Sequence, residues 1–341
     1  MSAETAPERG RVSVIIAGYN CESFIEPTIA SVLGQTYPRH SAEGNGDGDG
    51  HGDAAWRGMP AATVRRSTEI VFVDDGSSDG TRRVVEKFAP DVRYFAVPHG
   101  GVSAARNAGV KATTGQYVAF LDHDDLWAKD KIEKQIAMMD AHPDLGLVFT
   151  RAKVTGDPSH PPVIPPPGGP WEALIENGIA QRDPAALYAR LLLENFVPFS
   201  SILARRVAMP IGGFREDLRY SEDHDFLLRM SELKRFGFLD ETLTTYTIRA
   251  GRATSRMGDL RLEDIAILAD NVHRNPWLMR REGAAMRRRE RALLKEAGYW
   301  LMKEGRGPEA RRFLRQAWRK SPFDVKLPAY LLASMTGSSR G

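Results

Sequence analysis

The chain has 341 residues, which is enough for one large α/β domain and a smaller additional unit. Its hydrophobic content of 42% and charged content of 27% are close to globular averages and exclude a fibrous or generally disordered chain. The net charge of +3 is slight, and the single cysteine, Cys21, excludes an internal disulfide and favours a reducing compartment, so we expect a cytoplasmic protein.

The first third of the chain alternates short apolar runs with segments of helical periodicity, a pattern typical of βαβ units around a mostly parallel sheet. Residues 12–17, 70–73, 93–97, 117–121 and 147–150 predict strands, and residues 22–35, 79–89, 102–113 and 129–141 predict helices. No run reaches the roughly 20 apolar residues of a membrane span, and residues 1–11 lack the pattern of a signal peptide. The sequence therefore predicts a doubly wound α/β fold.

Two segments interrupt this alternation. Residues 40–62 are rich in glycine and aspartate and predict a disordered insertion, and residues 156–170 are rich in proline and predict an extended surface loop. Residues 260–335 have helical periodicity throughout, with breaks at residues 275–276, 305–308 and 321–322. We therefore predict an α/β domain over residues 1–257 and a helical C-terminal region over residues 258–341.

Two carboxylates, Asp74 and Asp75, directly follow the second predicted strand. In an open parallel sheet, ligands lie beyond the carboxyl ends of the strands, where a carboxylate can accept hydrogen bonds from a base or a ribose. Gly76 permits a tight turn, and Asp79 is expected to cap the next helix. Asp75 is therefore the candidate ligand contact, although a purely structural role in the turn is an alternative.

A second acidic cluster ends the strand at residues 117–121 and contains Asp122, Asp124 and Asp125. Carboxylates this close repel one another unless a cation offsets their charge, and such oxygen ligands suit Mg²⁺ or Mn²⁺ shared with a diphosphate. His123 lies between them, but we expect it to be a solvated neighbour. No spacing of cysteines and histidines favours zinc.

The third acidic group, residues 221–225, opens a predicted helix. Acids in a first helical turn interact favourably with the helix dipole, so capping by Ser221 or Asp225 is one interpretation. Asp223 is the candidate general base, because a carboxylate facing a metal-diphosphate site could take a proton from an acceptor hydroxyl.

Together these motifs resemble the family 2 inverting glycosyltransferases, whose domain has the GT-A fold. The resemblance covers residues 12–255, and its elements stand in family order at residues 12–20, 74–81, 101–109, 122–125 and 222–223. It implies a GT-A domain over residues 1–257 that transfers a sugar from a nucleotide sugar, above all a UDP-sugar, with inversion to an acceptor hydroxyl. It also implies a role in polysaccharide or envelope-glycan assembly with a glycan or a lipid-linked acceptor.

The resemblance further implies individual roles. Donor-binding residues would be Ala17, Tyr19, Asp75, Arg106, Asn107 and Asp124, the ligands of Mg²⁺ or Mn²⁺ would be Asp122, Asp124 and Asp125, and Asp223 would be the base. For Arg106 and Asn107, a salt bridge and a helix-surface amide are the alternatives. The chain departs from the family where many relatives carry an arginine and a histidine after Tyr246, since Thr247 and Arg249 stand there, and Arg249 could contact the diphosphate.

Two other classes of function differ from the one that this resemblance implies. A dehydrogenase is excluded because no glycine-rich dinucleotide motif follows the first strand. The alternative function is a non-catalytic nucleotide- or glycan-binding protein that acts through its basic helices.

The C-terminal region is basic, since residues 252–320 hold about twice as many Lys and Arg as Asp and Glu. We predict that its arginines make a peripheral contact with anionic lipid at the inner face of the membrane, with a solvated helix face as the alternative. No nucleic acid is expected, because aromatic residues do not interleave with them. These arginines are Arg280, Arg281, Arg287, Arg288, Arg289 and Arg291.

Overall fold

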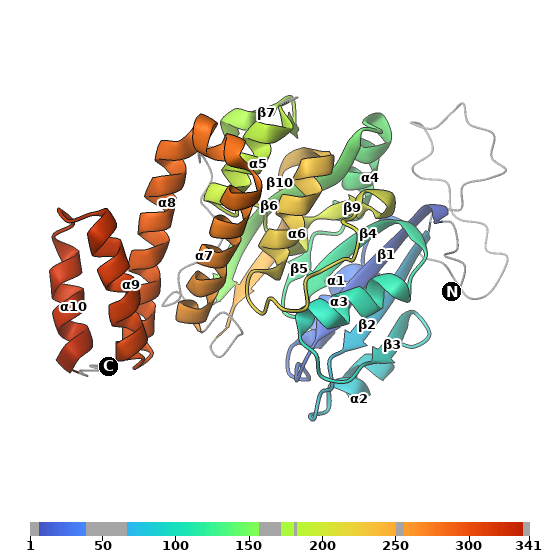
Figure 1. Cartoon of the computed structure of the whole chain (residues 1–341). Coiled ribbons are helices and arrows are strands. Elements are labelled where there is room, and N and C mark those ends of the chain that lie inside the picture. The colour runs from blue at the N-terminus through green and yellow to red at the C-terminus, as the bar shows by residue number, and fades with distance from the viewer. Residues whose placement is uncertain (1–6, 39–66, 157–171, 181–182, 250–255, 337–341) are drawn as a thin grey trace.

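The structure is a computed structural model that describes residues 7–38, 67–156, 172–180, 183–249 and 256–336. A twisted mixed sheet forms its centre, and helices cover both faces (Figure 1). The predicted insertion at residues 40–62 lies outside the described residues, and so does the predicted proline-rich loop apart from Gly156. The sheet accordingly positions everything that follows.

Half of the sheet is parallel, as the sequence predicts. Its strands run in the order β3, β2, β1, β4, and their bounds are β1 Glu8–Gly18, β2 Ser67–Asp74, β3 Val92–Ala96 and β4 Gly115–Asp122. Strand β1 is buried on both faces, because Val14 and Ile16 face one apolar core while Ile15 and Ala17 face the other. This two-sided burial explains why these strands read as continuous apolar runs rather than as alternating patterns.

The other half of the sheet was not fully predicted. The short strand β9 (Leu203–Arg205) lies antiparallel between β4 and β6 (Leu145–Gly156), and β6 pairs in parallel with the long strand β10 (Arg235–Ile248). Strands β8 (Ile179–Ala180) and β7 (Ile175–Glu176) complete this edge, and β5 (Leu126–Trp127) also pairs with β10. Only β6 among these strands was predicted.

The helices divide between the two faces of the sheet. On one face α1 (Ile25–Leu33), α2 (Thr81–Glu86) and α4 (Lys131–Ala141) pack through Ile29, Val85 and Ile136. On the other face lie α3 (Val102–Lys111), α5 (Pro184–Leu193) and α6 (Glu222–Leu233). The helices predicted before residue 145 are thus confirmed, with ends that differ by a few residues.

Four helices form the C-terminal part of the structure, at one end of the molecule (Figure 1). They are α7 (Met257–Arg274), α8 (Pro276–Lys303), α9 (Gly307–Lys320) and α10 (Lys326–Thr336), so the predicted breaks are confirmed. Ile267 of α7 and Leu278 of α8 belong to the same apolar core as the sheet, whereas Leu314 and Leu327 form a separate small core. No helix in the described part of the chain is both long and apolar enough to span a bilayer.

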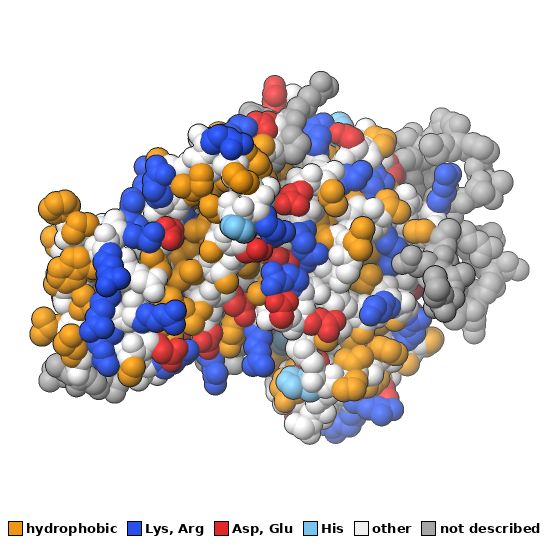
Figure 2. Space-filling model, in the orientation of Figure 1, with side chains coloured by type: hydrophobic (Ala, Val, Ile, Leu, Met, Phe, Trp, Pro, Cys, Tyr) orange, Lys and Arg blue, Asp and Glu red, His pale blue; other side chains and the backbone are white. Residues whose placement is uncertain are grey.

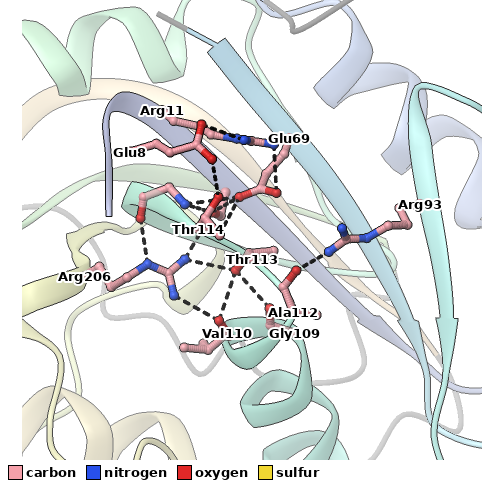
Figure 3. Close-up of polar contacts among 12 residues, drawn as sticks. Glu8, Arg11, Glu69, Arg93, Gly109, Val110, Ala112, Thr113, Thr114 and Arg206 are labelled. Atoms are coloured by element: carbon pink, nitrogen blue, oxygen red, sulfur yellow. Dashed lines mark hydrogen bonds and ion pairs between the residues drawn. The ribbon is translucent and has the colours of Figure 1, made fainter. Parts of the chain in front are cut away.

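A polar network stabilises the amino-terminal edge of the parallel strands (Figure 3). The Arg206 guanidinium donates to the carbonyl oxygens of Gly115 and Val110 at 2.6 and 2.9 Å and to the Thr113 hydroxyl at 2.9 Å. Nearby, the Glu69 carboxylate accepts from the Ser13 hydroxyl at 2.7 Å and pairs with Arg11 at 3.1 Å. The network therefore joins β1, β2, β4 and the end of α3.

Candidate functional site

The carboxyl ends of three parallel strands meet at the opposite edge of the sheet. Gly18 of β1 is in register with Asp74 of β2, and Ala17 is in register with Asp122 of β4. This register brings the first two predicted acidic motifs to the two sides of β1. The strand pairing thus places both motifs at one edge of the sheet.

The first motif holds the turn that precedes α3. The buried Asp75 carboxylate accepts hydrogen bonds from the backbone N–H groups of Gly100 and Gly101 at 2.8 and 3.0 Å, and His99 Nδ1 lies 2.9 Å from Asp75 Oδ2. Gly101 has φ of +90°, which a residue with a side chain rarely adopts. Asp75 therefore fixes the loop at residues 99–101, a contact that the sequence analysis missed although the glycine pair signalled a special backbone conformation.

An exposed aromatic pair lies beside this loop. Tyr19 is 43% exposed, and its ring centroid lies 4.5 Å from that of His99. Ala17 is buried within β1, and its carbonyl oxygen lies 3.2 Å from His123 Nδ1. The edge thus offers one exposed aromatic ring next to the polar Asp75 loop. Asp79 accepts from the backbone N–H of Thr81 at 3.0 Å, but the N-cap position of α2 is Gly80 and no side chain caps the helix, so the expected cap is not formed.

The second motif separates into exposed and buried carboxylates. The side chains of Asp122 and Asp124 are 32% and 16% exposed, and Arg249 Nε lies 3.6 Å from Asp124 Oδ2. The Arg249 guanidinium also lies 4.1 Å from the centre of the Phe24 ring. Burial, together with the charge of Asp122, raises the pKa of Asp124, and this is only partly offset by His123 and Arg249. Arg249 therefore lies at this edge, as its proposed role requires.

Asp125 lies differently from what was expected of a metal ligand. It is fully buried, and its Oδ1 accepts a hydrogen bond from the backbone N–H of Thr247 in β10 at 2.9 Å. Burial first, and then repulsion by Asp122 and Asp124, raise the pKa of Asp125 well above its ordinary value. Asp125 therefore joins the acidic cluster to β10, and Asp122 and Asp124 are the carboxylates of this cluster that reach the surface.

Arg106 connects the second motif with the third. Its buried guanidinium pairs with Asp122 at 2.7 Å and with Glu222, the first residue of α6, at 2.8 Å. It lies against two aromatic rings, 4.6 Å from the centre of Phe199 and 5.4 Å from that of Phe214. Arg106 thus makes the salt bridges that were the alternative to direct donor contact. The end of β4 and the start of α6 are held together by one cation.

Asn107 is also turned inward. Its side chain donates to the carbonyl oxygen of Phe214 at 2.9 Å and accepts from the Phe214 backbone N–H at 2.8 Å. It further donates to Glu216 at 2.9 Å. Asn107 is therefore a buried amide that holds the loop before α6, rather than the helix-surface amide considered from the sequence.

Asp223 stands in the first turn of α6, partly exposed, and its Oδ1 accepts from the His224 backbone N–H at 2.6 Å. Burial, with the neighbouring charge of Glu222, raises the pKa of Asp223 to about 8, against the opposing effect of Arg106. A carboxylate with such a pKa can exchange a proton near neutral pH.

The capping interpretation of this motif is wrong. Ser221 occupies the N-cap position, but its hydroxyl donates to Asp264 at 3.0 Å instead of accepting from the helix. Asp225 pairs with Arg229 at 2.7 Å, one turn further along α6. The side chains that would cap a helix in isolation are therefore used in tertiary contacts.

Two carboxylates at this edge could hold a divalent cation. Among the described residues, no three His, Cys, Asp or Glu side chains converge on one point as a complete metal site. Asp122 and Asp124 nevertheless present partly exposed carboxylates at one strand end. Mg²⁺ and Mn²⁺ are often held by one or two carboxylates, with water and substrate phosphates completing the coordination. The pair fits such a cation.

Comparisons with known proteins agree with this geometry. Residues 62–182 match the family described as glycosyl transferase family 2. A relative in Escherichia coli, UDP-Glc:alpha-D-GlcNAc-diphosphoundecaprenol beta-1,3-glucosyltransferase WfaP, is 33% identical over 132 residues, which cover 38% of this chain and 41% of that protein. The chain thus spans about two fifths of the length of the first curated relatives that it matches.

Two solved structures share the fold. S. aureus TarS 1-349 in complex with UDP-GlcNAc has a TM-score of 0.58 at 19% identity, over 96% of this chain and 89% of that one. The mannosyltransferase PcManGT from Pyrobaculum calidifontis in complex with GDP-Man and Mn²⁺ has a TM-score of 0.55 at 18% identity, over 98% and 89%. At these identities the likeness concerns the fold.

Proposed function

Because the chain is a GT-A member of glycosyl transferase family 2, we propose that it transfers a sugar from a nucleoside-diphosphate sugar to an acceptor hydroxyl, with inversion at the anomeric carbon. One observation carries this proposal: a carboxylate with a pKa of about 8, Asp223, begins the helix that Arg106 joins to the acidic strand end. Under this proposal, Arg106 would join the proton acceptor to the edge that binds the diphosphate.

The donor nucleotide would lie at the carboxyl edge of β1 and β2. Tyr19 offers an exposed ring for stacking of a base, supported from beneath by His99. Ala17 and Asp75 would line the pocket, Asp75 chiefly by holding residues 99–101 in place. A UDP-sugar is our proposed donor, since the TarS structure of this fold contains UDP-GlcNAc.

The diphosphate would lie over Asp122 and Asp124. These two carboxylates would hold Mg²⁺ or Mn²⁺, which would supply positive charge to offset the departing nucleoside diphosphate. Arg249, 3.6 Å from Asp124, would add a fixed cation beside the phosphates. Arg106 and Asn107 would support the site from below by holding β4, α6 and the preceding loop together.

Asp223 would act on the acceptor. Its carboxylate would take the proton from the attacking hydroxyl while the sugar transfers in a single in-line displacement, which inverts the anomeric carbon. The raised pKa matches a general base that works near neutral or mildly alkaline pH. Glu222 is not the candidate, because its carboxylate is already paired with Arg106 at 2.8 Å.

The acceptor would be a glycan or a lipid-linked glycan in polysaccharide or envelope assembly, at the cytoplasmic face of a membrane. The relative WfaP is named for a diphosphoundecaprenol-linked sugar. The arginines of α8 give uneven support to the membrane contact, because Arg281 pairs with Asp183 at 2.6 Å while Arg280, Arg287 and Arg288 are exposed. The contact would need further residues.

The end of the molecule formed by α9 and α10 could supply these further residues for the membrane contact. Arg315 and Arg319 of α9 are exposed, and so are the apolar Phe323, at 93%, and Val325 in the turn before α10. Figure 2 shows basic side chains beside a group of hydrophobic side chains at the end of the molecule that Figure 1 assigns to α9 and α10. Adjacent cations and apolar side chains favour the surface of an anionic bilayer.

A transfer assay separates catalysis from the non-catalytic alternative. The full chain is incubated with UDP-sugars and Mn²⁺, with and without excess chelator, and release of UDP and labelled product are measured. Metal-dependent UDP release that Asp223→Asn abolishes would support the enzyme. Donor binding in a thermal-shift assay without any release of UDP would favour a nucleotide-binding protein instead. Cosedimentation with anionic vesicles that the double variant Phe323→Ser, Arg319→Ser retains in full would contradict the membrane contact.

A further inference from the structure

One carboxylate of the C-terminal region binds the backbone immediately before α6. Glu263 lies in the second turn of α7, and its Oε1 accepts from the backbone N–H of Arg219 at 2.8 Å. Its Oε2 accepts from the N–H groups of Tyr220 and Ser221, both at 2.9 Å. Three consecutive amides thus point at a single side chain that is more than forty residues away in the sequence.

This contact is unusually specific for a connection between two parts of a chain. Hydrogen bonds to a charged acceptor are shorter and about twice as strong as neutral ones. A negative charge near the start of a helix is also favoured by the helix dipole, and α6 begins at Glu222, one residue beyond the third amide. Asp264, the next residue of α7, accepts from the Ser221 hydroxyl at 3.0 Å. The path of the backbone into α6 is therefore set by α7.

The residues on either side of Asp223 are held as well. Glu222 pairs with Arg106 of α3 at 2.8 Å, and His224 Nε2 lies 2.8 Å from the carbonyl oxygen of Leu191 in α5. The Asp223 side chain has no ion pair among the described residues, and its direction depends on the backbone that these contacts fix. Contacts from α3, α5 and α7 thus converge on this one turn, and in the described part of the chain the amides of residues 219–221 are held by α7.

We propose that Glu263 is a positioning residue for the general base Asp223, so that α7 is part of the catalytic unit rather than an appendage. This inference rests on the proposed function. Glu263 lies beyond the motifs of the family resemblance, which end before α7. It acts by fixing the backbone at residues 219–221 and hence the distance from the Asp223 carboxylate to the acceptor hydroxyl.

The test begins with Glu263→Gln, which keeps the size of the side chain but replaces one acceptor oxygen with a donor group that opposes the amides. We expect kcat to fall about tenfold to a hundredfold, because small displacements of a catalytic group have effects of this size. The KM for the donor should not change, since the donor edge is formed by β1, β2 and β4. Asp270→Asn is the matched control, because Asp270 pairs with Arg274 within α7.

Two further measurements distinguish positioning from general stability. Hydrogen exchange should show faster exchange of the amides at residues 219–221 in Glu263→Gln, with protection of β1 and β4 unchanged. In an Asp223→Asn background, Glu263→Gln should cause no further loss of kcat, because the group that it positions is already absent.

Other results would contradict either the positioning role of Glu263 or the proposed function. An equal loss of kcat in both backgrounds, or an unchanged kcat in Glu263→Gln, would overturn the positioning role. If the variant is too unstable to assay, Glu263→Asp, which keeps the charge on a shorter side chain, should recover part of kcat, and a stable Glu263→Asp with wild-type kcat would equally overturn it. A wild-type chain that transfers no sugar would refute the proposed function, while the exchange measurement would still report whether Glu263 holds the backbone.

Discussion

The two edges of the parallel sheet both carry polar networks, but their balance of charge differs. At the amino-terminal edge, Arg206 donates mainly to neutral carbonyl and hydroxyl oxygens, while Glu69 pairs with Arg11 and accepts from a hydroxyl and backbone amides (Figure 3). At the carboxyl-terminal edge, the buried Arg106 serves both Asp122 and Glu222.

Further acidic residues lie close to Asp122 and Glu222. Asp124, Asp125 and Asp223 all have raised pKa values, chiefly because they are buried. A network that only stabilises a fold can match donors with acceptors and charges with countercharges. An edge that keeps excess negative charge is arranged for a cation or a proton, which is the property expected of a functional site.

The largest expected effect comes from removing the proton acceptor. Asp223→Asn should lower kcat about a hundredfold to ten-thousandfold, because it retains size but not basicity. Donor affinity and the fold should persist, as measured by thermal shift with UDP. Asp217→Asn, which removes an exposed carboxylate paired with Arg215 in the loop before α6, is the control. Near-normal turnover in Asp223→Asn would show that the charge excess has no catalytic purpose.

Substitutions at the amino-terminal edge should instead lower stability and leave kcat nearly unchanged. Arg206→Ala should lower the free energy of unfolding by roughly 2 to 5 kcal/mol, because several buried acceptors lose their donor. The kcat of the folded protein should stay close to wild type. Arg93→Ala, which removes a donor to Ala112 from an exposed side chain in the same network, should cost far less. Chemical denaturation measures both variants, and equal losses would refute the comparison.

The cation-binding part of the acidic edge can be tested separately. Asp124→Asn should weaken the apparent affinity for Mn²⁺ about tenfold to a hundredfold, because it removes one of two exposed carboxylates. His123→Ala should change it little, since His123 faces the Ala17 carbonyl. Activity titrated against Mn²⁺ gives both values. An Asp124→Asn variant with unchanged metal dependence would remove Asp124 from the metal site.

The smallest effect expected is a pH dependence. Because Asp223 must be ionised to accept a proton and its pKa is raised to about 8, kcat/KM should rise as pH increases and level off above that value. At pH values below this pKa, kcat/KM should increase about tenfold per pH unit. In Asp223→Asn, kcat/KM should not show this rise with pH. A wild-type profile that is flat between pH 6 and 9 would contradict the assignment of the raised pKa to the catalytic base.

Local pattern in the sequence determined a large part of this protein. Apolar runs buried on both faces gave the parallel strands, and the breaks at residues 275–276, 305–308 and 321–322 separated the C-terminal helices. The acidic motifs that follow β2 and β4 were recognised as candidate ligand contacts, and parallel strands place their carboxyl ends at one edge. Periodicity and turn chemistry act over a few residues, so the sequence displays them directly.

Tertiary structure decided which acids are exposed and which partners they have. Arg106 and Glu222 are separated by 116 residues, Asp125 and Thr247 by 122, and Glu263 reaches back over 42 to 44 residues to the backbone before α6. Only the packing of α3, α6 and α7 around the mixed sheet creates these pairs. Burial also sets the raised pKa of Asp223, since the carboxylate is perturbed by the low-dielectric surroundings and by Glu222. These surroundings come from elements distant in the chain, and no local pattern encodes them.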